Sequence, residues 1–164
     1  MNYQKCIAIL KRQTSSQPYK SQIKFAVLIC QKLYFNYQKF TKAYEWGNAD
    51  LLMDAIKICQ QGIENHLDIN QIKSLITQID SIIPDMDDFG SELSSYALNA
   101  STAVYETLEF IIDKDETHIY NIATYYTDTV DFKIQEEKEL SESEIENHPL
   151  MIEAWNFVIA QTKN

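Results

Sequence analysis

Apolar residues recur along this chain three or four positions apart, which is the spacing of an amphipathic helix. Such stripes predict helices over residues 1–11, 21–40, 52–63, 72–83, 93–111 and 118–134, and a last helix that starts at Pro149. The segment 118–134 is rich in Thr, Ile and Tyr, which favour strands, but its apolar spacing is helical and no hairpin turn interrupts it. We therefore predict an all-α protein, a single-domain bundle of about seven helices over residues 1–164.

The scarcity of glycine and proline supports long helices. The chain has three residues of each, whereas average usage predicts roughly 20 in total. Gly47, Gly62 and Gly90 are also too far apart to form a phosphate-binding loop. Local signals predict the helix ends: Asn48 or Asp50 as a cap, Pro84 as a stop, and Ser141-x-x-Glu144 as a capping box.

The charge is unevenly distributed along the chain. The net charge is −10. Residues 1–82 have ten Lys/Arg and six Asp/Glu, whereas residues 83–164 have four and eighteen. Binding to nucleic acid needs clustered lysine and arginine, so the overall charge disfavours it.

The compartment follows from what the chain lacks. Its longest apolar run is too short to span a bilayer or to serve as a signal-peptide core. Cys6, Cys30 and Cys59 form no C-x-x-C pair, which favours buried, inert thiols in a reducing cytoplasm. The alternative is a single redox-active cysteine. We expect a cytoplasmic protein that does not associate with membranes.

Several motifs occur in an order that resembles a known family. They are the acidic proline loop 83–89, an aromatic patch from Tyr34 to Gly47, and Asn147-His148-Pro149 with Trp155 beyond. Over about residues 23–155 this order resembles the bacterial YjaG-like family, domain of unknown function 416. The resemblance implies an all-α cytoplasmic protein but no activity, because the family has no established function. The chain departs from the family pattern in two ways. Phe35 stands where the family often has Pro, and we expect the chain to end soon after its last helix begins.

No motif predicts catalysis. The chain has no G-x-S-x-G, H-E-x-x-H or Walker sequence. Asp115-x-x-His118 would place a carboxylate and an imidazole on one helical face, but His66 and His148 lack such a partner, so we interpret Asp115 as a helix-start residue. The sequence therefore favours a protein without catalytic residues or cofactors.

The loop from Pro84 to Gly90 offers a possible metal site. Asp85, Asp87 and Asp88 place three carboxylates in four positions, which suits a hard divalent cation. The favoured interpretation is that one Asp caps the next helix and another makes a turn hydrogen bond.

Residues 34–46 carry six aromatic side chains among three nearby lysines. Such residues can fill a core, anchor a protein interface or stack on single-stranded nucleic acid, and we rank the three in that order. Phe40 and Trp46 are the candidate interface residues.

The most distinctive hint of function is a run of glutamates in residues 136–146. It holds one lysine and six glutamates: Glu136, Glu137, Glu139, Glu142, Glu144 and Glu146. Such a run forms either a solvated helix end or a docking surface for a basic partner. We predict a non-catalytic protein-binding module, one version being an immunity protein that neutralises a basic toxin. The alternative is an enzyme or a small-ligand or metal-binding protein that uses the Asp85–Asp88 loop and the aromatic patch.

Overall fold

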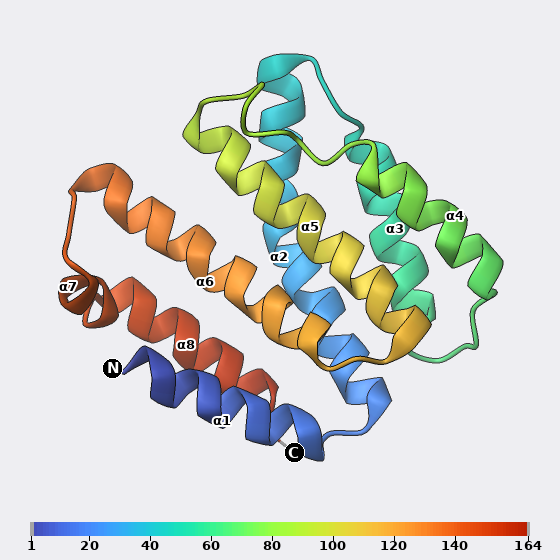
Figure 1. The fold of residues 1–164 in the computed structure, drawn as a ribbon, viewed down its shortest axis with the longest axis horizontal. Helices are drawn as coiled ribbons and strands as arrows, with labels where there is room; N and C mark the ends of the chain where they lie inside the picture. Colours follow the sequence, from blue (N-terminus) through green and yellow to red (C-terminus); the bar gives the residue numbers. More distant parts are fainter. Residues whose placement is uncertain (1, 164) are drawn as a thin grey trace.

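The computed structural model describes residues 2–163, and within this range the chain folds into eight helices (Figure 1). In chain order they are α1 Tyr3–Ser16, α2 Tyr19–Tyr44, α3 Ala49–Gln61, α4 Ile69–Asp80, α5 Glu92–Asp113, α6 Thr117–Glu137, α7 Glu142–Glu146 and α8 Pro149–Gln161. The prediction of an all-α fold is thus confirmed. The helix beyond the predicted seven is the short α7, which opens with the predicted capping box of Ser141 and Glu144.

Helices α2 and α5 lie at the centre of the bundle. They pack along each other, with α3 and α4 on one side and α6 on the other (Figure 1). Among the described residues, buried side chains of every helix but α7 join one hydrophobic cluster. Its largest fully buried members include Trp155, Tyr37, Phe40 and Phe110, so the predicted packing of Trp155 in the interior is confirmed.

Several helices, α1 and α6 among them, are longer than their apolar stripes predict. Helix α1 continues to Ser16 because Thr14, one turn beyond Leu10, is itself fully buried and extends the stripe. Helix α6 accommodates its threonines differently, since the hydroxyls of Thr124 and Thr129 donate to the carbonyls four residues earlier. A β-branched hydroxyl residue is therefore compatible with this helix, and the helical spacing predicted it correctly.

A buried tyrosine holds the corner after α2. The hydroxyl of Tyr37 donates to the Ile82 carbonyl at 2.7 Å and accepts from the Asn48 amide at 3.3 Å. Gly47 turns the chain here with φ of 86°, and a side chain at this position would collide with the Tyr37 hydroxyl. Asn48 then caps α3 by accepting from the Leu51 amide at 2.9 Å, which selects Asn48 over Asp50 as the cap.

The first and last helices lie side by side against α6 (Figure 1). At one end the Tyr3 amide donates to Glu146 at 2.9 Å. At the other the Thr162 hydroxyl donates to the Gln13 side chain at 2.8 Å. No helix within residues 2–163 combines the length and the hydropathy needed to cross a bilayer.

Candidate functional site

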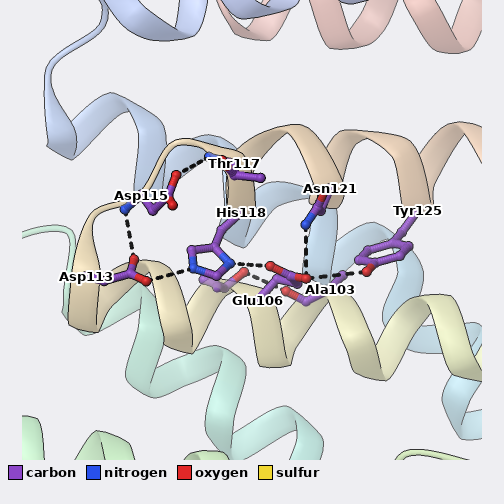
Figure 2. A network of polar contacts seen from close by, with 9 residues as sticks. Ala103, Glu106, Asp113, Asp115, Thr117, His118, Asn121 and Tyr125 are labelled. Atoms are coloured by element: carbon purple, nitrogen blue, oxygen red, sulfur yellow. Dashed lines mark hydrogen bonds and ion pairs between the residues drawn. The ribbon is translucent and has the colours of Figure 1, made fainter.

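A network of polar side chains joins α5 to α6 around Glu106 (Figure 2). The His118 ring bonds the Glu106 carboxylate through Nδ1 and the Asp113 carboxylate through Nε2, the latter at 3.1 Å. Glu106 also accepts from the side chains of Asn121 at 3.2 Å and Tyr125 at 3.4 Å. Three donors from α6 therefore converge on one carboxylate of α5.

The electrostatics of this network favour a charged imidazole. Burial disfavours the imidazolium, but the hydrogen bonds and negative charges of Glu106 and Asp113 outweigh it and raise the pKa of His118 above its usual 6.5. Asp115, three positions before His118, instead accepts from the Thr117 amide at 2.9 Å, at the start of α6. This position matches the helix-start interpretation of Asp115. The network thus satisfies a nearly buried carboxylate and ties two helices together.

The six predicted glutamates divide into two groups. Glu136 accepts from the Tyr96 hydroxyl, Glu144 closes the capping box, and Glu146 accepts from the Tyr3 amide. The other three are exposed and form no hydrogen bond or ion pair with any residue between 2 and 163: Glu137, Glu139 and Glu142. The structure therefore assigns hydrogen bonds to half of the run and none to the other half among residues 2–163.

A surface cavity of about 440 Å³ lies beside this run. It is enclosed by α6, by α7 with the segment before it, by the first turn of α1 and by the start of α8. Its polar walls, apart from Thr127, are Asp128, Asp131, Gln135, Glu142 and Glu146. Its other lining residues are apolar or aromatic: Tyr3, Leu140, Ile145, Met151 and Trp155. The cavity thus combines an apolar floor with an acidic rim.

Among the carboxylates that line the cavity, Asp128 has a shifted pKa. Burial, and next the negative charge of Asp131, raise its pKa to about 6. Asp131 accepts from the Gln135 side chain at 2.7 Å, whereas Asp128 accepts no hydrogen bond and pairs with no cation among the described residues. A half-buried carboxylate without a partner is typical of a binding site rather than of a structural contact.

The proline loop forms turns. Asp85 accepts from the Asp87 amide at 2.9 Å, which confirms the predicted turn hydrogen bond. The expectation that an Asp caps the following helix is wrong, because Ser91 occupies that position. Within residues 2–163 no group of three or more His, Cys, Asp or Glu side chains is arranged to hold a metal ion, and Asp85, Asp87 and Asp88 accordingly form no such group.

The aromatic patch lies largely in the interior. Phe40 is fully buried and contacts Tyr44, Trp46 and Phe89, and Trp46 is half-buried. Phe40 thus occupies the core, the use ranked first for these residues, and is not presented at the surface. Two aromatic side chains of this stretch are exposed, Phe35 at 65% and Tyr44 at 38%. The place of Phe35 opposite the buried stripe of α2 could have indicated its exposure.

The three cysteines are free and buried. Burial raises the pKa of Cys30 to about 12, although a hydrogen bond with Thr107 acts in the opposite direction. Burial likewise raises the pKa of Cys6 and Cys59. The prediction of buried thiols is confirmed, and their low reactivity remains a prediction.

The fold and the cavity define an all-helical protein with an acidic surface, and comparisons place it in a family. The chain belongs to the family described as "Protein of unknown function (DUF416)", whose model matches residues 10–162. The fold is similar to the crystal structure of a DUF416 family protein from Shewanella baltica OS155, with a TM-score of 0.79 and 21% identity over 92% of this chain and 80% of that one. At this identity the likeness shows the fold. No curated protein matches the chain.

Proposed function

We propose that the protein is a non-catalytic module that binds a basic protein partner through its acidic face. The acidic face consists of Glu137, Glu139 and Glu142 together with the rim of the cavity beside them. The observation that carries this proposal is the combination of unpaired carboxylates with an apolar hollow. A solvated helix end would show the charges without the hollow.

The physical properties of the acidic face suit protein recognition. Unpaired surface charges steer an oppositely charged partner and raise the rate of association. A concave apolar centre supplies the desolvated region in which binding energy concentrates. Glu137, Glu139 and Glu142 form no hydrogen bond or ion pair with residues 2–163, so none of these has to break before they meet a partner.

The test is a triple charge reversal, E137K/E139K/E142K. Its matched control is D54K/D87K/D88K, which changes the net charge equally at exposed positions on α3 and the proline loop. We expect the wild type and the control to capture the same basic protein from a lysate of the host cell, and the E137K/E139K/E142K variant to lose it. With the purified partner, the on-rate of the wild type should fall as salt is added. The reason is that salt screens charges beyond the Debye length, which is about 10 Å at 0.1 M.

Glu136, Glu144 and Glu146 are left unchanged in this design. Reversal of any of them would break a contact with Tyr96, Ser141 or Tyr3 and confuse a binding defect with a folding defect. Equal capture by both triple variants, or an on-rate independent of salt, would contradict the proposal. The acidic residues would then be a solvated surface.

The more specific version is an immunity protein for a basic toxin. The acidic face supports a basic partner of any kind, and the immunity version adds that the partner loses a toxic activity on binding. Coexpression of the captured partner with the wild type or with E137K/E139K/E142K in a test host measures this directly. Rescue of growth by the wild type alone is the expected result, and a partner without toxicity would leave a binding module of another kind.

A further inference from the structure

The cavity of the acidic face combines carboxylates with apolar side chains. This combination suits a ligand that carries a positive charge at the end of an apolar stem. Asp128 and Asp131 lie about one helical turn apart on α6, and Glu142 and Glu146 lie about one turn apart on α7. No lysine, arginine or histidine is among the eleven described residues that line the cavity. Two helices therefore bring four carboxylates to one hollow, and none of its described lining residues is positively charged.

Other ligand classes fit this hollow poorly. An anion would meet only like charges. A metal ion requires several hard ligands around one point, and no such group of three occurs within residues 2–163. A neutral apolar ligand would cover the floor but would leave half-buried Asp128 desolvated without a partner, which is unfavourable. The remaining class is an organic cation that contacts both the floor and the rim.

We propose that the cavity receives one lysine or arginine side chain of the basic partner, with its charged end at Asp128 and Asp131 and its stem on the apolar floor. This inference rests on the proposed function and names the anchor of that interface. Lysine and arginine match the hollow because their aliphatic stems cover apolar surface while the charged end stays at a polar rim. The stem would lie on Leu140, Met151 and Trp155, which line the cavity.

The chemistry at the charged end explains why one side chain gains affinity here. A hydrogen bond between an ionised donor and a carboxylate is about twice as strong as a neutral one. Asp128 has no competing donor among residues 2–163, so the incoming cation replaces water rather than an existing contact. Asp131 is held in place by Gln135 and supplies a second acceptor one turn away.

The test uses small probes of one side chain. In a Trp46→Phe background, Trp155 is the only remaining tryptophan and lines the cavity, so its fluorescence reports occupancy. We expect a saturable change with N-acetyl-lysine methylamide and with N-acetyl-arginine methylamide. Acetylation of the lysine ε-amine should abolish it. Asp128→Asn should weaken binding about tenfold, the size of one charge-assisted hydrogen bond.

Controls keep the result interpretable. Asp54→Asn, an exposed carboxylate on α3, should bind like the wild type. Asp131→Asn provides a second cavity variant, and circular dichroism verifies that each variant is folded. The proposal is overturned if acetylated lysine produces the same change, or if both cavity variants bind like the wild type. Tighter saturation by free butylamine than by the lysine probe would identify a small-amine site instead of a partner's side chain.

The two proposals fail in distinguishable ways. If E137K/E139K/E142K captures the basic partner as the wild type does, the proposed function fails. If that variant loses the partner while Asp128→Asn keeps an unchanged off-rate, the acidic face binds the partner and the cavity is not its anchor.

Discussion

The aromatic rings of Tyr3 and Trp155 meet edge to face, with centroids 5.5 Å apart and planes at 81°. Tyr3 belongs to the first turn of α1 and Trp155 to α8, and both line the cavity of the acidic face. Pairs in this geometry contribute about 0.5–1.5 kcal/mol beyond the area that they bury. This contact therefore joins two distant parts of the chain and shapes the floor of the proposed anchor site.

Replacement of Trp155 should be strongly destabilising. The side chain is only 2% exposed, and Trp155→Ala leaves a cavity in the interior, so we expect a loss of about 3–5 kcal/mol in the free energy of unfolding. Urea denaturation followed by circular dichroism measures it. Trp46→Ala is the matched control, because the side chain of Trp46 is only half-buried and its removal should lower the free energy of unfolding by less. Equal losses at the two positions would show that α8 contributes no more than the surface to stability.

Asp128 should reduce stability at neutral pH. Its pKa is raised from 3.8 to about 6, so the folded state binds the proton more tightly than the unfolded state. Stability therefore increases as pH falls from about 6 to about 4. Asp131, Glu142, Glu146, Tyr3 and Tyr125 surround the cavity or interact with this carboxylate, and none brings a positive charge.

Asp128→Asn should consequently raise the melting temperature at pH 7 by a few degrees, at about 2–4 °C per kcal/mol for a chain of this size. The gain should shrink toward pH 4, where the wild-type carboxyl is protonated. Thermal melts of both proteins across this range provide the measurement, with Asp54→Asn as the exposed control. A variant less stable than the wild type at pH 7 would show that Asp128 has a structural partner.

The network at His118 predicts a dependence of the same sign as that of Asp128, but at higher pH, because its pKa is also raised in the folded state. The folded-state pKa is raised above 6.5, so the stabilising contribution is complete below about pH 6.5 and is lost as pH rises through the raised value. The groups that face the ring are Glu106 and Asp113. Urea unfolding of the wild type and His118→Gln between about pH 6 and pH 9 should show their stabilities converging at the alkaline end. A constant difference would mean that the ring acts only through packing.

The thiols should react slowly in the native state. Cys6, Cys30 and Cys59 are each at most 2% exposed, and burial raises the pKa of all three, which lowers the fraction of reactive thiolate. Titration with Ellman's reagent should detect little labelling in buffer and three thiols in urea. Rapid labelling of one cysteine in buffer would revive the redox alternative.

The fold was predictable because its signals are local. The apolar stripe of each long helix repeats within the segment that forms it, and Asn48 and Ser141 lie beside the helices that they open. The stripes underestimated α1 because Thr14 is polar by type and yet fully buried. Its hydroxyl has no hydrogen-bond partner among the described residues, so the residue type gave no sign of this burial.

The candidate site was only partly predictable because its contacts link distant segments. The sequence offered only Asp115, one turn away, as a neighbour of His118 and favoured a helix-start role for it, whereas the ring binds Glu106 across a helix interface. The glutamate run was visible, but the cavity needs Asp128 of α6 to meet Glu146 of α7, and this depends on how the chain reverses between the two helices. The available signal for the cavity was Asp128, a carboxylate that lies between the buried Thr127 and Thr129.

The contact between α1 and α8 also determines when a binding surface can exist. Tyr3 and Glu146 are 143 positions apart, and Gln13 and Thr162 are 149 apart, so each contact closes a loop of nearly the whole chain. Contacts of such long range form late in folding because they require the largest loss of chain entropy. During synthesis the growing chain can assemble α2 to α6 before α8 has emerged from the ribosome. The cavity, whose lining includes Trp155, is therefore complete only after α8 docks, and the proposed binding of a partner there requires that docking.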